Sequence, residues 1–393
     1  MKLKKRILLS IITALFTLVF SYWVTNLNIP ISGEKEVIAA YEYLTNSEHP
    51  LNVPDSILLI NVSFDRELVD VTENEVPLGN TPITDRNKLL KLLKGLEQDT
   101  TYKYILLDIF FSERYKTGTD SALFATINSL PRIVVPGHQN SNISPEIHKN
   151  KVGIADYLTT PLSTDFVKYQ YTSSDGISLA QKMYEDMTKH RIENHTLFYS
   201  DNGHLARNCI VLTYELLFNQ SLHDYNSSIW QNLGTDVLDE ESDELNIDYK
   251  DKYILIGAFD DDIHSTYMGT VSGPIINFNA YLALLHGKHY VSLWFFFIMF
   301  ILFFIMSFLV YSEKTLKDYI AQFPQFAWKP LQIVMRIILL FCSWMGFASI
   351  LTFMCIVTYL QLGEIYDIVI TATFFELLRK SISIINATRL CKE

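Results

Sequence analysis

The sequence is short of cysteine and of positive charge. Its 393 residues include 43 acidic and 32 basic side chains, and the net charge is −11. An acidic chain argues against nucleic-acid binding, which requires clustered Lys and Arg. Of the four cysteines only Cys209 lies in the long polar stretch between the apolar ends of the chain, so no disulfide can form within that stretch.

The sequence also lacks the short motifs of common enzymes. It contains no nucleophile elbow, no phosphate-binding loop and no dinucleotide fingerprint, and its cysteines do not have zinc-site spacing. We therefore assign no catalytic residue, no cofactor and no metal site, and we expect the protein not to be an enzyme.

Long apolar runs lie at the N-terminus and in about the last hundred residues. A run of about 20 apolar residues is long enough for a helix to cross a bilayer. We predict four transmembrane helices, over residues 7–27, 290–311, 331–359 and 365–378. A cleaved signal peptide is the alternative for the first, and a re-entrant segment is the alternative for the last.

Basic residues predict the orientation of these spans. They occur in the flank 1–6, in the loop 312–330 and in the tail 379–393. All three segments lie on one side of the membrane only if there are four spans, and the positive-inside rule makes that side cytoplasmic. Both termini are then cytoplasmic, and residues 28–289 form one domain outside the plasma (inner) membrane.

The predicted outer domain alternates strands with helices. Short apolar runs typical of buried parallel strands cover residues 56–62, 104–110, 132–137 and 252–257. Helical spacing is present at residues 34–44, from a cap at Thr84 or Asp85 to Leu96, from a cap at Asp120 to Leu130, from Asp175 to about Lys189, and over 278–287. This order predicts an α/β fold with a mostly parallel sheet and flanking helices.

Two connecting segments complete this prediction. Residues 77–82, with two prolines and a glycine, are expected to form a loop before the helix at Asp85. The helix 278–287 is followed closely by the span 290–311, so we expect it to link the sheet rigidly to the membrane.

Acidic residues follow several of the predicted strands. Ligands of parallel α/β sheets bind beyond the carboxyl ends of the strands. The candidate ligand-binding residues are Asp65, Asp108, Glu113, Asp260, Asp261, Asp262 and His264. If adjacent, they suit a divalent cation or an amine; the alternatives are acid–base catalysis, or caps and turn residues of polar loops.

Several segments, taken in order, carry a resemblance to one family. They are the helix start Thr84-Asp85-Arg86, the set Asp108, Phe111, Ser112 and Asp120, the strand 252–257, the pair Asp262 and Thr266, and Gly273 followed by Asn279-Ala280. Together with one span before the domain and three after it, they resemble the CHASE type 2 domain. This is the second class of sensory domains found outside the membrane on cyclases and histidine kinases.

The sequence departs from the family in three places, one of which is the segment 259–268, where acidic residues are denser than the resemblance leads us to expect. No arginine follows Asp175-Gly176 at the expected spacing, and the chain stops at Glu393, where family members typically continue into a cytoplasmic kinase, cyclase or phosphodiesterase. We therefore expect a stand-alone member without a cytoplasmic output domain.

The resemblance implies a sensory or ligand-binding protein of receptor type that relays to a separate cytoplasmic partner. The alternative is a structural or scaffold component of a cell-envelope assembly, and a membrane enzyme or transporter ranks third. The expected partners are the lipid bilayer, an extracytoplasmic ligand or protein, and a cytoplasmic signalling or assembly protein. A homo-oligomer stays open, and no nucleic acid is expected.

Overall fold

The computed structural model describes residues 3–27, 56–73, 76–139, 141–156, 165–216, 229–238, 245–312, 344–362 and 365–390. The predicted helix 34–44, most of the loop 312–330 and the first part of the span 331–359 lie outside these residues. The chain forms two compact units. The helical unit comprises residues 1–47, 194–211 and 290–393, and the α/β unit comprises residues 48–193 and 212–289.

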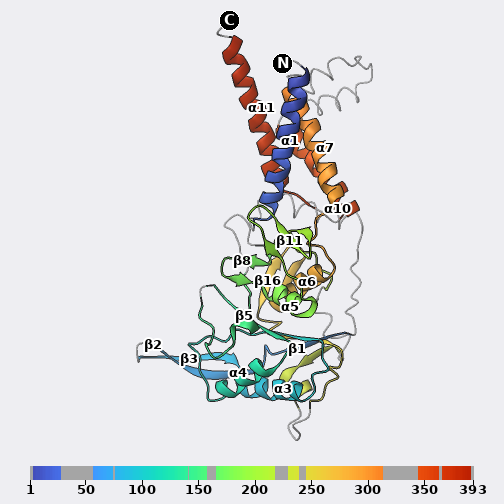
Figure 1. The fold of residues 1–393 in the computed structure, drawn as a ribbon. Coiled ribbons are helices and arrows are strands. Elements are labelled where there is room, and N and C mark those ends of the chain that lie inside the picture. The colour runs from blue at the N-terminus through green and yellow to red at the C-terminus, as the bar shows by residue number, and fades with distance from the viewer. Residues whose placement is uncertain are drawn as a thin grey trace, which may run out of the picture. The chain divides into compact units, whose positions relative to one another are not determined.

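A six-stranded sheet forms the centre of the α/β unit (Figure 1). Its strands, in spatial order, are β14 (Trp230–Asn232), β1 (Ile57–Asn61), β15 (Tyr253–Gly257), β4 (Tyr104–Asp108), β5 (Ile133–Gly137) and β6 (Val152–Ile154). Every neighbouring pair is parallel, which confirms the predicted α/β class. The edge strands β14 and β6 were not predicted, because three residues carry too little pattern.

Helices cover both faces of this sheet, with α3 (Arg86–Gln98) and α4 (Asp120–Ser129) on one side and α5 (Leu179–Thr188) and α6 (Gly273–Leu285) on the other (Figure 1). Side chains of α3 and α4 share one core cluster with Leu58, Ile105 and Ile254. On the opposite face, the Tyr104 hydroxyl donates to Asp186 of α5 at 2.6 Å. Burial on both faces explains why the strands are continuous apolar runs.

The predicted loop around residues 77–82 is wrong. These residues belong to an antiparallel hairpin of β2 (Arg66–Glu73) and β3 (Val76–Thr84), with a register shift after Val71. Proline is tolerated there because a two-stranded ribbon leaves part of each backbone edge unpaired. A second hairpin, β16 (Ile263–Thr266) and β17 (Gly269–Ser272), follows β15.

The helix starts were predicted with mixed success. Asp85 caps α3 as expected, since its carboxylate accepts the N–H groups of the second and third helical residues. Asp120 is not a cap but the first residue of α4, and it accepts the Thr117 N–H at 2.9 Å. α5 begins after Ser178, whose hydroxyl caps it, and not at Asp175.

Short elements complete the α/β unit and its connections. They are the 3₁₀ turn η1 (Lys149–Lys151), the π-helical turn η3 (Leu233–Val237), and the strands β7 (Lys168–Gln170), β8 (Thr172–Ser173) and β9 (Gly176–Ile177). The strand β13 (Cys209–Val211) belongs to the helical unit. Cys209, at the start of β13, is buried.

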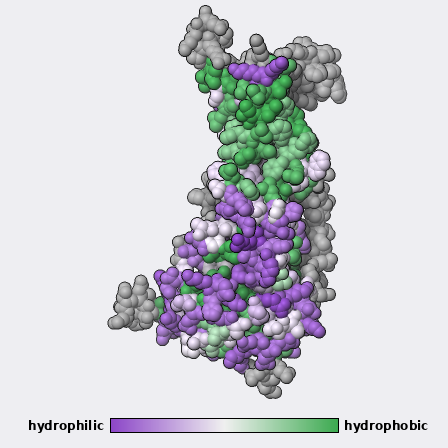
Figure 2. All heavy atoms as spheres, in the orientation of Figure 1, coloured by the Kyte–Doolittle hydropathy of each residue, from purple (hydrophilic) through white to green (hydrophobic). Residues whose placement is uncertain are grey.

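The helical unit contains α1 (Leu3–Thr25), α7 (Leu293–Tyr311), α10 (Trp344–Leu362) and α11 (Ile368–Leu390). Among the described residues, α1 and α7 are long and apolar enough to cross a membrane. Figure 2 shows that the surface of these helices is predominantly hydrophobic, whereas the α/β unit is predominantly hydrophilic. Phe16 of α1 and Phe297 of α7, for example, are 58% and 55% exposed.

A small sheet of the helical unit is hydrogen-bonded to α1 and to the segment just before α7. Its strands are β10 (Glu193–Asn194), β11 (Tyr199–Asp201) and β12 (His204–Ala206). The Tyr22 hydroxyl of α1 donates to the Ala206 carbonyl at 2.6 Å and accepts the Tyr199 N–H at 3.0 Å. The N–H of Val291, two residues before α7, donates to the Leu205 carbonyl at 2.9 Å.

The predicted rigid link into the second span is not a continuous helix. α6 begins at Gly273, earlier than expected, and ends at Leu285. Gly287 follows in the left-handed region at φ +71°, and α7 starts only at Leu293.

Gly257 offers a direct test of the packing between β15 and α6. A Cβ atom added there would lie 2.5 Å from Cγ of Pro274. We expect Gly257→Ala to cost about 1–3 kcal/mol and to lower the Tm of the full chain in detergent by several degrees. Gly118→Ala, with no atom within 4 Å of the added carbon, is the control and should be neutral. Equal Tm values for the two variants would contradict this packing.

Candidate ligand-binding site

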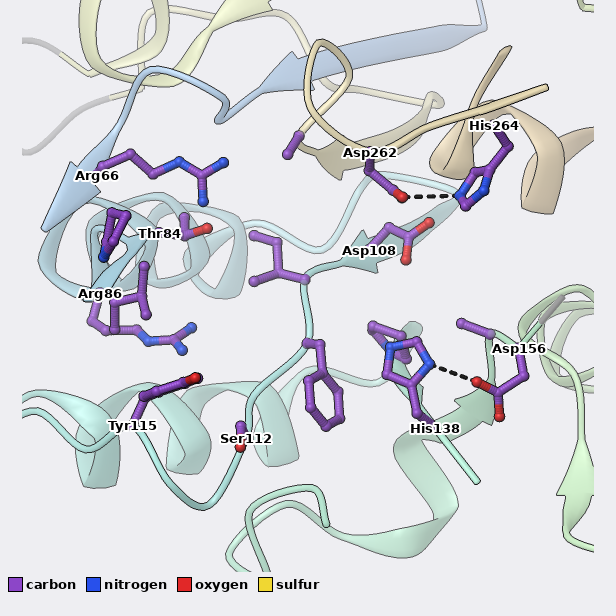
Figure 3. A pocket seen from close by; sticks show the side chains of 17 residues that line it. Arg66, Thr84, Arg86, Asp108, Ser112, Tyr115, His138, Asp156, Asp262 and His264 are labelled. Carbon is purple, nitrogen blue, oxygen red and sulfur yellow. Dashed lines mark hydrogen bonds and ion pairs between the residues drawn. The ribbon is translucent and has the colours of Figure 1, made fainter. Parts of the chain in front are cut away.

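The register of the sheet brings three strand ends level. Asn61 of β1 pairs with Gly257 of β15, which in turn pairs with Asp108 of β4. A cavity of about 420 Å³ lies beyond the carboxyl ends of the strands and is lined by residues that follow β4, β5, β6 and β15 and by the β2–β3 hairpin (Figure 3). This is the position where parallel α/β sheets bind their ligands.

Three of the seven predicted site residues line this cavity: Asp108, Asp262 and His264. Asp108 is the last residue of β4, whereas Asp262 and His264 come from the loop and hairpin after β15. The Asp262 carboxylate and the His264 Nε2 lie 2.9 Å apart, and Figure 3 shows both side chains next to Asp108.

The other four predicted residues do not line the cavity and contact protein groups instead. Asp65 pairs with Lys88 at 2.6 Å, Asp260 accepts from Asn61 at 2.9 Å, Asp261 pairs with Arg66 at 2.5 Å, and Glu113 accepts from Asn142 at 2.7 Å. Within the described parts of the chain, no three His, Cys, Asp or Glu side chains form a group that could hold a metal ion. The seven predicted residues therefore do not form one group. Ligand binding by the three that line the cavity stays a prediction.

The cavity also contains polar residues that the sequence did not single out for binding. His138 follows β5 and Asp156 follows β6, and His138 Nδ1 lies 2.9 Å from the Asp156 carboxylate. Arg66 of β2 and Arg86 of α3 supply two guanidinium groups. Their positions in the sequence could have indicated a site. Each of these residues lies at or just beyond the end of a strand or helix that meets the same edge of the sheet.

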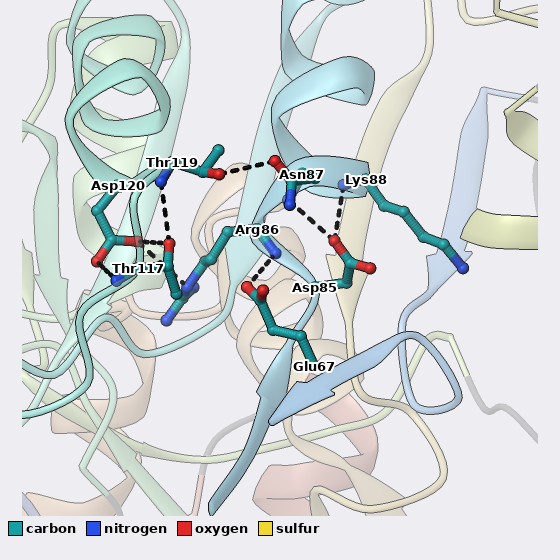
Figure 4. Close-up of polar contacts among 8 residues, drawn as sticks. All are labelled: Glu67, Asp85, Arg86, Asn87, Lys88, Thr117, Thr119 and Asp120. Carbon is teal, nitrogen blue, oxygen red and sulfur yellow. Dashed lines mark hydrogen bonds and ion pairs between the residues drawn. The ribbon is translucent and has the colours of Figure 1, made fainter. Parts of the chain in front are cut away.

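Arg86 is held in place by its surroundings (Figure 4). Its backbone N–H donates to Glu67 of β2 at 2.8 Å, and its Nε lies 3.7 Å from Asp120 of α4. Its Cζ lies 4.4 Å from the ring centroid of Phe111. The side chain is only 2% exposed, and this burial lowers the pKa of Arg86, an effect that the charges of Asp120 and Glu67 partly offset.

Asp108 is the carboxylate of the cavity whose pKa is raised. Burial raises the pKa of Asp108 to about 7, and the negative charge of Asp262 adds to the shift. A hydrogen bond from Asn277 Nδ2, 2.9 Å long, and the proximity of His264 act in the opposite direction. The Tyr169 hydroxyl donates to Asn277 Oδ1 at 2.9 Å, which fixes the amide so that its NH₂ group faces Asp108.

Gly273 positions Asp262. Its N–H donates to the Asp262 carbonyl at 2.8 Å, and a Cβ atom at Gly273 would lie 2.0 Å from Asp262 Oδ2. Only glycine therefore lets this carboxylate lie against the first residue of α6. The dipole of a helix favours a negative charge at that end.

Comparison with known families gives one match. The CHASE2 domain model matches residues 38–311, which is more than half of the chain. Searches of curated proteins and of solved structures found no match.

The raised pKa of Asp108 predicts how stability changes with pH. Because its folded-state pKa of about 7 lies above the ordinary value of 3.8, the folded protein holds a proton between these values that the unfolded chain has lost. This group therefore lowers the free energy of unfolding as the pH rises through this window. The Asp108→Asn side chain is neutral at every pH. Its free energy of unfolding, relative to that of the wild type, should therefore be higher by at least about 2 kcal/mol at about pH 8 than at about pH 5.

Thermal unfolding of the full chain in detergent at the two pH values measures this difference. The gain corresponds to roughly 4–8 °C in Tm for a domain of this size. Asp175→Asn, a change at an exposed carboxylate outside the cavity, is the control and should show the same difference from wild type at both pH values. If the effect of Asp108→Asn on the Tm does not change with pH, the pKa of Asp108 is not raised in the folded protein.

Proposed function

The chain belongs to the CHASE2 family of sensory domains, and on this premise we propose that it is a membrane-anchored receptor whose α/β unit binds a small molecule outside the cytoplasm. Binding is relayed to a separate cytoplasmic partner. The observation that carries the proposal is the cavity at the carboxyl ends of the parallel strands, where side chains from six separate segments meet.

The cavity has the features of a small-molecule site. Such sites are concave, are lined in part by apolar side chains and contain a few converging polar groups. Apolar residues such as Ile83, Ile109 and Phe110 line it beside Asp108 and Arg86. A carboxylate with a raised pKa in a concave site is also a recognised indicator of function.

The proposed membrane topology has four spans with both termini in the cytoplasm. α1 and α7 meet the criteria of length and apolarity. We assign the third and fourth spans to α10 and to the first part of α11, because this arrangement leaves the basic residues Arg379 and Lys380 on the cytoplasmic side. α11 continues to Leu390 and, in this topology, projects its last turns into the cytoplasm.

The chain offers routes for a relay. It passes from one unit to the other between residues 47 and 48, between 193 and 194, between 211 and 212, and between 289 and 290. Within the helical unit, the β11–β12 hairpin is hydrogen-bonded to Tyr22 of α1 and to Val291 before α7. We propose that a change in the α/β unit moves this hairpin and, with it, both helices.

Filling the cavity tests the binding function while the ligand is still unidentified. Ala155 lines the cavity, so Ala155→Phe places a ring inside it. Small molecules extracted from the full chain purified from native membranes are then identified by mass spectrometry. We expect one compound at near-stoichiometric amounts in wild type and at least about tenfold less in the variant, a loss of about 1.4 kcal/mol or more.

The matched control is Ala122→Phe, which adds the same ring at an exposed position on α4. It should retain the compound, and the Tm of both variants reports on folding. A compound retained equally by a folded Ala155→Phe variant would refute binding in this cavity. Loss of the compound with no effect on the association of cytoplasmic proteins would favour the scaffold function over the receptor.

A further inference from the structure

Arg86 lines the cavity, but two of the nitrogens of its guanidinium are enclosed by protein atoms. Its Nε and Nη1 are buried and have no hydrogen-bond partner among the described residues. The contact with Asp120 is 3.7 Å long, and the contact with Phe111 is to the face of its ring, so neither is a hydrogen bond. Unsatisfied buried donors are costly, and a guanidinium carries five of them, so a ligand oxygen that reached the Arg86 guanidinium would be stabilised.

Other donors surround the Arg86 guanidinium. Figure 3 shows it on the same side of the cavity as Arg66 and the hydroxyl groups of Thr84 and Tyr115, with Ser112 at the border. Arg66 is already paired with Asp261, so the Arg86 guanidinium and the neighbouring hydroxyls are the groups suited to a carboxylate. The planar guanidinium presents parallel N–H groups to the two carboxylate oxygens.

The opposite side of the cavity has the reverse character. Figure 3 shows Asp108, Asp156 and Asp262 there, with the two imidazoles. Asp156 and Asp262 each have a histidine at 2.9 Å. Asp108 accepts from the neutral amide of Asn277, and no cationic side chain of the described residues lies within ion-pair distance of it. Asp108 is therefore the carboxylate of this end that has no ion-pair partner among the described residues.

We propose that the cavity binds a small zwitterion of the amino-acid class, with its carboxylate at Arg86 and its ammonium group at Asp108. This inference rests on the proposed receptor function and specifies its ligand. An ammonium group has three donors and no acceptor, which suits the acidic side. A simple anion would be repelled by the three carboxylates, and a simple amine would leave Arg86 unsatisfied.

The cavity is large enough for such a molecule. The cavity volume of about 420 Å³ exceeds what one amino acid occupies. Apolar side chains, among them Ile83, Phe110 and Pro136, form part of its wall. They offer a surface for an apolar side chain of the ligand, while the polar ends fix its orientation.

The test is a thermal-shift screen of the full chain in detergent with the standard L-amino acids, each at about 1 mM, since a ligand that binds the folded state raises the Tm by mass action. We expect at least one to raise the Tm. Its N-acetyl derivative, which lacks the ammonium group, and its decarboxylated amine should both bind at least about tenfold more weakly by calorimetry. A screen in which no amino acid raises the Tm overturns the proposal.

Two variants test which residue binds the ammonium group and which binds the carboxylate of the ligand. Asp108→Asn and Arg86→Gln should each weaken binding of the amino acid by about tenfold or more. If Arg86→Gln does not fold, Arg86→Lys takes its place, since lysine keeps the charge but loses the planar pair of donors. The controls are Asp175→Asn and Arg114→Gln, exposed positions outside the cavity that should leave the affinity unchanged. Equal affinity of the Asp108 variant and its control would overturn the assignment of the ammonium end, and equal affinity of the arginine variant and its control would overturn that of the carboxylate end.

The outcomes separate this inference from the proposed function. Binding of an N-acetyl amino acid or of a decarboxylated amine as tight as that of the parent amino acid refutes the zwitterion. The receptor function stands in that case if Ala155→Phe abolishes the binding. A co-purified compound that a folded Ala155→Phe variant retains refutes the cavity itself, whichever chemical class the compound has.

Discussion

β15 hydrogen-bonds to β1 along one side and to β4 along the other, and the cavity depends on this double pairing. The pairing places Gly257 level with Asp108, so the chain that leaves β15 emerges beside the end of β4. That chain carries Asp262 and His264 to the acidic side of the cavity. The close approach of Pro274 to Gly257 then fixes the start of α6, from which Asn277 donates to Asp108.

The sequence predicted the central strands and the fold class because strands buried on both faces are continuous apolar runs. It did not predict that β15 lies between β1 and β4, because pairing between distant segments leaves no local pattern. The contacts of Asp65 and Asp261 were missed for a related reason. Their partners, Lys88 and Arg66, are positioned by the β2–β3 hairpin and by the helix that follows it, and the hairpin was expected to be a loop.

The two arginines of the cavity show a different limit of sequence analysis. Arg86 was predicted at the start of a helix, and α3 does begin there. Arginine is seldom fully buried, so its 2% exposure had no signal in the sequence. Burial follows from the packing of α4, β2 and Phe111 around it, which only the assembled fold supplies.

The central place of β15 also determines when the domain can fold. Its partners in β1 lie about 200 residues earlier in the chain, so the sheet stays in two incomplete halves until residues 253–257 have been synthesised. Contacts this distant in sequence are slow to form, since the loop between them must first be closed. Until then β1 and β4 each present an unpaired apolar edge. The nascent domain is thus most prone to aggregation in the interval just before the last strand of the six-stranded sheet is added.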